Sequence, residues 1–263
     1  DWPAYDDLIQ GAVGIPALTA AASGAEPRYV PLTMADRMVG LTAAGHIMAA
    51  LFHRQKSGQG QQLEIPMFET MAAHVLGDHM GGLTFDPPIG DWGYRRLLSQ
   101  ERKPYRTRDG YLCVLIYSDR QWTSFFTAVG RADALGDPRC ADITARTKHI
   151  DALYGELAAI MITRDTADWL DMLRRFDIPA MPLATPATLL DDPHLAAVGL
   201  IEGSDHPTEG RVRMVGDPTR WSRTHPDRRR PTPRLGEHSA EILAEAGLSD
   251  AEIAGLKASA ATV

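Results

Sequence analysis

Asp36 is the side chain whose place in the sequence best suits covalent chemistry. It opens a segment with helical periodicity that runs over residues 36–52, where apolar residues recur and small residues fill other positions. Unpaired backbone N–H groups and the positive end of the helix dipole stabilise a carboxylate at such a place in its charged, nucleophilic form. A carboxylate so placed can attack a thioester. The alternative is that Asp36 is only an N-cap, a commoner role for aspartate at a helix start.

Other kinds of chemistry lack their usual sequence signals. Cys113 and Cys140 show no CxxC or Cys/His spacing, and the histidines show no H-E-x-x-H, so we expect two free thiols and no metal site. The sequence also lacks GxGxxG, a P-loop and G-x-S-x-G. Dinucleotide oxidoreductase, nucleotide hydrolase and serine hydrolase functions therefore have no motif support.

Composition narrows the function classes further. The 263 residues are 44% hydrophobic, which is enough for a substantial core, and the formal net charge of -7 argues against nucleic-acid binding. We find neither an apolar stretch of roughly 20 residues, as a membrane span needs, nor a signal peptide. The sequence thus favours a cytoplasmic protein whose partners are small molecules or protein. Because it opens at Asp1 on a helical pattern, we expect an internal cut.

The elements that would position Asp36 are helices and short strands. The helix over 36–52 should stop at Gly58 or Gly60, followed by a strand over 62–65 and a helix over 68–80. This order indicates an α/β fold. A Gly/Pro-rich stretch over 81–93 then predicts a domain boundary.

The rest of the chain predicts a small α/β unit and a return segment. Asp109-Gly110 is a turn signal between two strands, and Asp119 is placed to cap a helix. The further expected elements are helices over 150–162 and 166–176, a hairpin over 200–215, an extended stretch over 216–234, a helix over 237–246, and a last helix with a Ser249/Glu252 capping box.

Short motifs form one pattern along nearly the whole chain. They lie at 29–32, 35–36 with Gly40, 49–54, 57–61, 66–69, 102–107 with 109–111, and 234–238. The pattern resembles class III coenzyme A (CoA) transferases, the CaiB/BaiF family, which includes formyl-CoA transferase and carnitine-type transferases.

The resemblance implies an acyl-CoA:carboxylate CoA-transferase in which Asp36 is catalytic. In that family the matching aspartate attacks the acyl-CoA thioester, and an aspartyl anhydride and an aspartyl-CoA thioester follow. CoA thioesters would then be substrates, with a carboxylate as the second partner, and no cofactor would be tightly bound.

Tyr5 bears on the first alternative, a 2-methylacyl-CoA racemase of the same superfamily. Racemases use a His and an Asp as paired acid and base, and the His precedes an Asp in a G-H-D stretch. The matching place here reads Ala4-Tyr5-Asp6, and transferases that resemble formyl-CoA transferase carry a substrate-contacting tyrosine there. Because tyrosine has a reference pKa of about 10 and is a poor base near neutral pH, Tyr5 favours transfer and is expected to bind substrate.

The resemblance also implies an architecture. The family has a Rossmann-like large domain and a small α/β domain, in an interlocked homodimer. We therefore expect 1–90 to be the C-terminal part of the large domain, 91–195 the small domain, and 196–263 a return linker with C-terminal helices. Exposed apolar surface is expected where the N-terminal part of the large domain would pack.

Two departures from the family pattern matter. The oxalate-using branch has a glycine-rich loop near the region that matches 97–100, where this chain reads Leu-Leu-Ser-Gln, which argues against a formyl/oxalate pairing. The family's N-terminal segment, which carries most CoA contacts, would precede residue 1. A further alternative is therefore a truncated, non-catalytic acyl-CoA-binding or assembly module.

Overall fold

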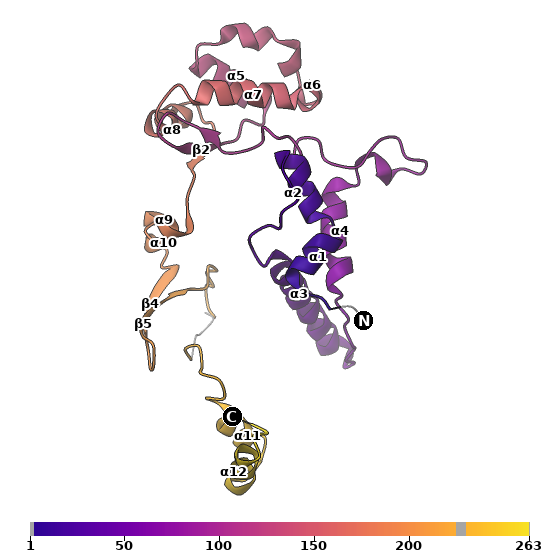
Figure 1. Ribbon diagram of the computed structural model, residues 1–263, viewed down its shortest axis with the longest axis vertical. Coiled ribbons are helices and arrows are strands. Elements are labelled where there is room, and N and C mark those ends of the chain that lie inside the picture. The colour runs from indigo at the N-terminus through magenta and orange to yellow at the C-terminus, as the bar shows by residue number, and fades with distance from the viewer. Residues whose placement is uncertain (1–2, 225–229, 263) are drawn as a thin grey trace. The chain divides into compact units, whose positions relative to one another are not determined.

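The computed structural model describes residues 3–224 and 230–262, and the chain divides into two compact units, Asp1–Leu183 and Ala184–Val263. Figure 1 labels their α-helices and the strands β2, β4 and β5. In the first unit they are α1 (Asp6–Ala12), α2 (Ile15–Ser23), α3 (Met34–Ser57), α4 (Met67–His79), η1 (Gly81–Thr84), β1 (Tyr105–Arg106), β2 (Tyr111–Val114), α5 (Asp119–Ala128), η2 (Ala132–Gly136), η3 (Pro138–Cys140), α6 (Ile143–Lys148), α7 (Ile150–Met161), α8 (Thr166–Arg175) and β3 (Ala180–Pro182). In the second they are α9 (Pro186–Leu189), α10 (Pro193–Ala197), β4 (Ile201–His206), β5 (Gly210–Val215), α11 (Ser239–Glu245) and α12 (Asp250–Ala258).

Helices α1 to α4 pack around a small apolar cluster at the start of the chain. Ile9 and Ile15 meet Ala35 and Val39 of α3 and Met71 of α4, and α1 contacts each of the other three helices. Ala35 is fully buried, so its methyl group lets the backbone of α3 come close to its neighbours. This cluster fixes the first turn of α3, on which Asp36 lies.

The long helix predicted from residue 36 is confirmed, although it begins two residues earlier, at Met34. It ends at Gly58, one of the two predicted stops, whose left-handed φ of 75° suits glycine and whose N–H bonds the Arg54 carbonyl. Beyond the first turns α3 exposes apolar side chains, such as Leu41 at 77% and Met48 at 65%. Exposed apolar side chains are thus present on this helix, and their role as a packing surface for an N-terminal part of the large domain stays a prediction.

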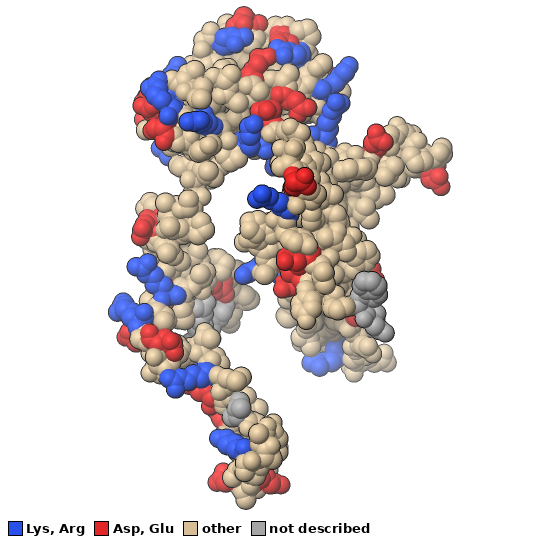
Figure 2. Space-filling view, in the orientation of Figure 1, with Lys and Arg blue, Asp and Glu red and all other residues tan. Residues whose placement is uncertain are grey.

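The second core lies between α5 to α8 and an antiparallel sheet of order β1-β2-β3. Leu112 of β2, Phe125 of α5 and Trp169 of α8 are all fully buried in it. The hairpin predicted at Asp109-Gly110 is confirmed, because β1 pairs with β2 with Arg106 opposite Tyr111. Basic and acidic side chains alternate over this part of the surface (Figure 2), so the visible face carries no broad patch of one sign.

The prediction that Asp119 caps α5 is wrong. The N-cap is Ser118, whose Oγ accepts from the Gln121 N–H while the Gln121 side chain bonds back to the Ser118 backbone. Asp119 is the first helical residue and forms an ion pair with Arg146. The one-residue error is typical of adjacent Ser-Asp pairs, since both side chains can cap.

In the second unit the predicted hairpin and capping box are confirmed. β4 and β5 pair from Ile201–Val215 to His206–Gly210, and the Ser249 hydroxyl accepts from the Glu252 N–H at the start of α12. The strand predicted over 62–65 is wrong. In the described ranges this segment pairs with no other strand, and an extended segment without a partner forms no ladder. The chain is mixed α/β with antiparallel pairing in both sheets described, and the domain limits at 90 and 195 stay predictions.

Candidate active site at the start of α3

Asp36 is the third residue of α3, in the turn where backbone N–H groups lack intrahelical partners. It is therefore not the N-cap; that position belongs to Thr33, whose side chain makes no capping bond. The carboxylate of Asp36 is exposed and, within residues 3–224 and 230–262, has no hydrogen bond or ion pair. A free carboxylate in a first helical turn is open to an incoming electrophile.

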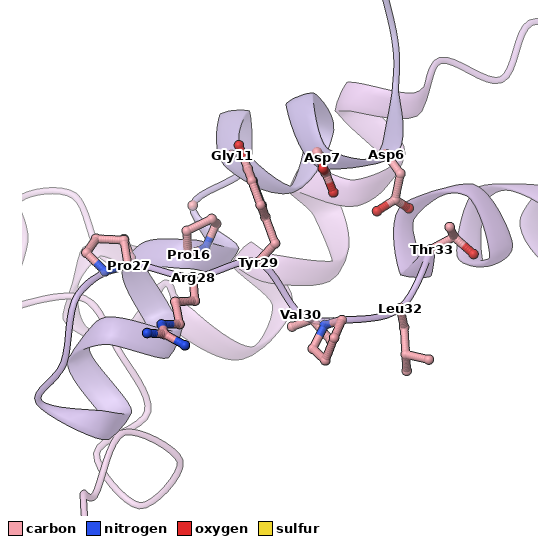
Figure 3. A pocket seen from close by; sticks show the side chains of 13 residues that line it. Asp6, Asp7, Gly11, Pro16, Pro27, Arg28, Tyr29, Val30, Leu32 and Thr33 are labelled. Atoms are coloured by element: carbon pink, nitrogen blue, oxygen red, sulfur yellow. The ribbon is translucent and has the colours of Figure 1, made fainter. Parts of the chain in front are cut away.

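Asp6 of α1 supplies the cap that Thr33 does not. Its Oδ1 accepts a hydrogen bond from the backbone N–H of Asp36 at 3.0 Å. Figure 3 shows the Asp6 carboxylate beside Thr33, where α3 begins. Desolvation acts to raise the pKa of Asp6, but hydrogen bonds from Gln10 and from the backbone of Asp36 and Ala35 outweigh it and hold that pKa below its ordinary value. At neutral pH the start of α3 thus holds an anion from another helix, next to Asp36.

Gln10, one turn after Asp6 on α1, connects this cap to the segment that enters α3. It is fully buried, and its Nε2 donates to Asp6 Oδ2 at 2.7 Å and lies 3.3 Å from the Val30 carbonyl and 3.2 Å from the Leu32 carbonyl. Its Oε1 accepts from the Val30 N–H at 2.9 Å. One amide side chain therefore satisfies backbone groups on the approach to α3 and orients the capping carboxylate.

Tyr5 lies beside this network, as the N-cap residue of α1. Its backbone carbonyl accepts from the Ile9 N–H, and its side chain is 71% exposed and makes no hydrogen bond within the described part of the chain. Tyr5 immediately precedes Asp6, whose side chain accepts a hydrogen bond from the Asp36 N–H. The backbones of Tyr5 and Asp36, the two predicted site residues, therefore lie at the same end of α3. The structure records no contact between their side chains in the residues it describes.

An open groove of about 980 Å³ borders the same helix end (Figure 3). It runs between α1, the start of α2 and the segment 27–33, and its wall includes Asp6, Tyr29, Leu32 and Thr33. Arg28 is the one cation among its described lining residues. A Thr19 hydroxyl bonds the Arg28 carbonyl at 2.8 Å and fastens that side of the groove. Asp36 and Tyr5 are not in the lining, so the groove adjoins the predicted site and does not contain it.

Asp6 and Gln10 are the residues that the sequence-based reading of the site missed. Their spacing of four on one helix is a weak signal, because it places two polar side chains on the same face next to apolar Ile9. The pattern does not show what this face contacts. Its partner is the N-terminus of α3, which begins at Met34, 28 positions after Asp6.

Two kinds of feature are missing from the described residues. Within them, no three His, Cys, Asp or Glu side chains gather closely enough to hold a metal ion. The same ranges contain no helix with both the length and the apolar character needed to cross a bilayer.

Comparisons with known proteins agree on one family. A family model described as CoA-transferase family III matches residues 1–239. Formyl-CoA:oxalate CoA-transferases of Escherichia coli and of Shigella dysenteriae are 27% identical over 276 aligned residues, which cover 97% of this chain. The chain spans 66% of the length of these relatives.

Solved structures show the same fold. A CAIB/BAIF family protein from Brucella suis superposes with a TM-score of 0.68 at 28% identity, over 92% of this chain and 62% of that one. Rv3272 from Mycobacterium tuberculosis gives a TM-score of 0.73 at 22% identity, over 91% of this chain and 63% of that one, and so supports the fold alone. Because the family model covers far more than half of its length, the chain belongs to CoA-transferase family III.

Proposed function

We propose that the protein containing this chain transfers CoA from an acyl-CoA to a carboxylate, with Asp36 as the nucleophile. The observation that carries the proposal is the free, exposed carboxylate of Asp36 in the first turn of α3, in a chain that belongs to CoA-transferase family III. Its own N–H is held by Asp6, which fixes the backbone while leaving the side chain unpaired.

The covalent steps follow from carboxylate and thioester chemistry. An Asp36 oxygen attacks the thioester carbonyl, the C–S bond breaks, and the CoA thiolate leaves with the electron pair, which gives an acyl-aspartyl anhydride. The thiolate attacks the aspartyl carbonyl of that anhydride and releases the donor acid, so that Asp36 becomes a thioester of CoA. The acceptor carboxylate attacks this thioester, the C–S bond breaks, and the thiolate leaves as a second anhydride forms between the acceptor and Asp36. The thiolate then attacks the acceptor acyl carbonyl of that anhydride, which gives the new acyl-CoA and frees the Asp36 carboxylate.

Tyr5 fits the role of a substrate contact. Its side chain is 71% exposed at the helix end where Asp36 lies, and a phenol can donate one hydrogen bond to a substrate oxygen. We expect Tyr5→Phe to raise the KM of the acyl-CoA or the carboxylate more than it lowers kcat, because the lost bond acts on binding. A fall in kcat with unchanged KM would instead place Tyr5 in the chemical step.

The relatives' name mentions formyl-CoA and oxalate, yet this chain differs where the oxalate-using pattern has glycines. Ser99 is buried, and its hydroxyl donates to Asp151 Oδ1 at 2.5 Å, which ties the segment 97–100 to α7. Such an anchored segment lacks the backbone freedom of a glycine-rich loop. We therefore propose a different pair of acyl groups.

The test is to trap the intermediate. The protein is incubated with an acyl-CoA and hydroxylamine, which converts an aspartyl anhydride or thioester to a hydroxamate, and the modified peptide is located by mass. We expect the label on Asp36 and no exchange in Asp36→Ala. Asp78→Ala removes an exposed aspartate of α4 and is the matched control, which should retain full exchange.

Three outcomes would contradict the proposal. Exchange at the wild-type rate in Asp36→Ala would exclude Asp36 as the nucleophile. Deuterium uptake at the α-carbon without any carboxylate acceptor would favour the racemase. Binding of acyl-CoA without label or exchange in the wild-type protein would favour a non-catalytic module.

A further inference from the structure

A second pocket, remote in sequence from Asp36, lies in the small α/β part of the first unit. It has a volume of about 520 Å³, which is in the range of small-molecule sites. The segment before β1, the strands β2 and β3, and α7 all contribute to its wall. Its lining includes Arg96, Arg102 and Lys103 and contains no carboxylate among the described residues.

Two buried tyrosines, Tyr105 and Tyr154, line this wall. Tyr154 is 5% exposed, and its hydroxyl accepts from Arg96 Nε at 3.1 Å, which leaves its own proton to donate. Tyr105 is 3% exposed, and in the described ranges its hydroxyl has no hydrogen-bond partner. That hydroxyl is not sealed from its surroundings, and Tyr105 lines the pocket. A buried phenol without a hydrogen-bond partner inside the protein calls for an explanation, and an acceptor atom of a bound ligand would supply one.

The cations differ in how far they are already neutralised. The Arg96 guanidinium lies 4.8 Å from the centre of the Tyr117 ring, which holds it in place, and within residues 3–224 and 230–262 it has no carboxylate partner. Lys103 is paired with Glu101 at 3.1 Å. Arg102 is exposed, and in the described parts of the chain its side chain makes no hydrogen bond or ion pair. The pocket therefore retains positive charge beside two hydroxyl donors.

Apolar groups make the remaining wall. They include Pro104, Val114, Leu115 and Met181, and Met181 is 73% exposed. Burying such a side chain against an apolar ligand is favourable, at about 25 cal/mol per Å². The site thus combines an anion-binding end with an apolar surface.

We propose that this pocket binds a small amphipathic anion, a carboxylate or phosphate headgroup on an apolar body, with Tyr105 and Arg102 as headgroup contacts. Arg96, held by Tyr154 and Tyr117, positions the Tyr154 hydroxyl for the same headgroup. The proposal does not depend on the transfer reaction, because none of these residues contacts Asp36 in the described structure.

Calorimetric titration of the whole chain tests the proposal with three ligands that carry the same pentyl tail: hexanoate, pentyl phosphate and uncharged hexanamide. We expect saturable binding of at least one anion, weakening as salt is added, and at least tenfold weaker binding of hexanamide. The tighter of the two anions identifies the headgroup. Failure of both anions to saturate, or equal binding of hexanamide, would overturn the proposal.

Variants assign the site. Tyr105→Phe removes only an unpartnered hydroxyl, so the fold should be kept while binding falls about tenfold. Arg102→Gln should weaken binding about threefold. Arg106→Gln is the control, because Arg106 is an exposed cation next to Tyr105 in β1 but does not line the pocket. This variant should bind the anion as tightly as the wild type. Unchanged affinity in Tyr105→Phe would refute the assignment, whereas Asp36→Ala should bind normally whether or not the transferase proposal holds.

Discussion

Replacing Gln10 with glutamate tests the network that holds the start of α3. The substitution keeps the shape of the side chain and the acceptor for the Val30 N–H, but it turns the donor into an oxygen that faces the Asp6 carboxylate across 2.7 Å. The carbonyls of Val30 and Leu32, now 3.3 and 3.2 Å from a donor, lose it. We expect Gln10→Glu to be strongly destabilised near neutral pH.

The size of the effect is limited by proton uptake. Loss of hydrogen-bond donation costs about 1 kcal/mol. Two carboxylates at this distance would repel by about 6 kcal/mol at an effective dielectric constant of 20, so the pair takes up a proton instead. Protonating a carboxyl of pKa about 4.3 at pH 7 costs about 4 kcal/mol, which sets the total near 5 kcal/mol. The introduced carboxyl has a raised pKa in the folded state. The free energy of unfolding of Gln10→Glu is therefore highest below about pH 4.3, and it falls by about 1.4 kcal/mol per pH unit above that value.

Urea unfolding followed by far-UV circular dichroism at a series of pH values measures this difference, and hydrogen exchange at the Val30 amide localises it. Gln121→Glu is the matched control, because Gln121 Oε1 only accepts bonds, from the Tyr117 and Ser118 N–H groups, and glutamate keeps both. It should change stability by less than about 0.5 kcal/mol. A Gln10→Glu protein as stable as the wild type at neutral pH, or one with no pH-dependent difference, would show that the network does not hold α3.

Three further predictions concern the caps and the core. In urea unfolding, Asp6→Ala should lower the free energy of unfolding by about 1 kcal/mol because a helix cap is lost, and Asp6→Asn should lower it less. Because the pKa of Asp6 is lowered from 3.8, this contribution to stability is present above that pH and is lost as the pH falls through the folded-state pKa. A stability difference that does not change in acid would contradict this prediction. Hydrogen bonds from the Thr166 backbone and side chain lower the pKa of Asp109 at the start of α8. Thermal melts should therefore show a lower Tm for Asp109→Ala than for the wild type at neutral pH, and the difference in Tm should close in acid. A difference that stays constant with pH would show that these hydrogen bonds to the ionised carboxylate do not stabilise the fold. Trp169→Phe should cost about 2 kcal/mol in urea because a fully buried Nε1 bond to the Met161 carbonyl is lost, while Trp221→Phe, at a 52% exposed site, should be near neutral; equal losses would refute the distinction.

Local sequence rules predicted most helices and hairpins of this chain. The left-handed stop at Gly58, the Asp109-Gly110 hairpin and the Ser249/Glu252 capping box all depend on neighbouring residues, and each is confirmed. The strand over 62–65 is wrong, because a strand depends on a partner that the local pattern cannot supply.

The family was also readable from the sequence, since short motifs along nearly the whole chain carry the resemblance that the family model supports over residues 1–239. Asp36 and Tyr5 as site residues, and the domain limits, stay predictions. The amphipathic-anion pocket had no sequence signal, because Arg102, Tyr105 and Tyr154 come together only when α7 packs beside β1.

What the sequence determined by itself is the identity and local setting of Asp36: a carboxylate in the first turn of a helix with a glycine stop. What only the tertiary structure decided is how that turn is held. The capping anion comes from Asp6, and the buried amide of Gln10 binds both the cap and the segment that precedes the helix. Helix propensity acts over a few neighbouring residues, whereas this arrangement depends on the packing of α1 against α3, which brings together groups 30 positions apart.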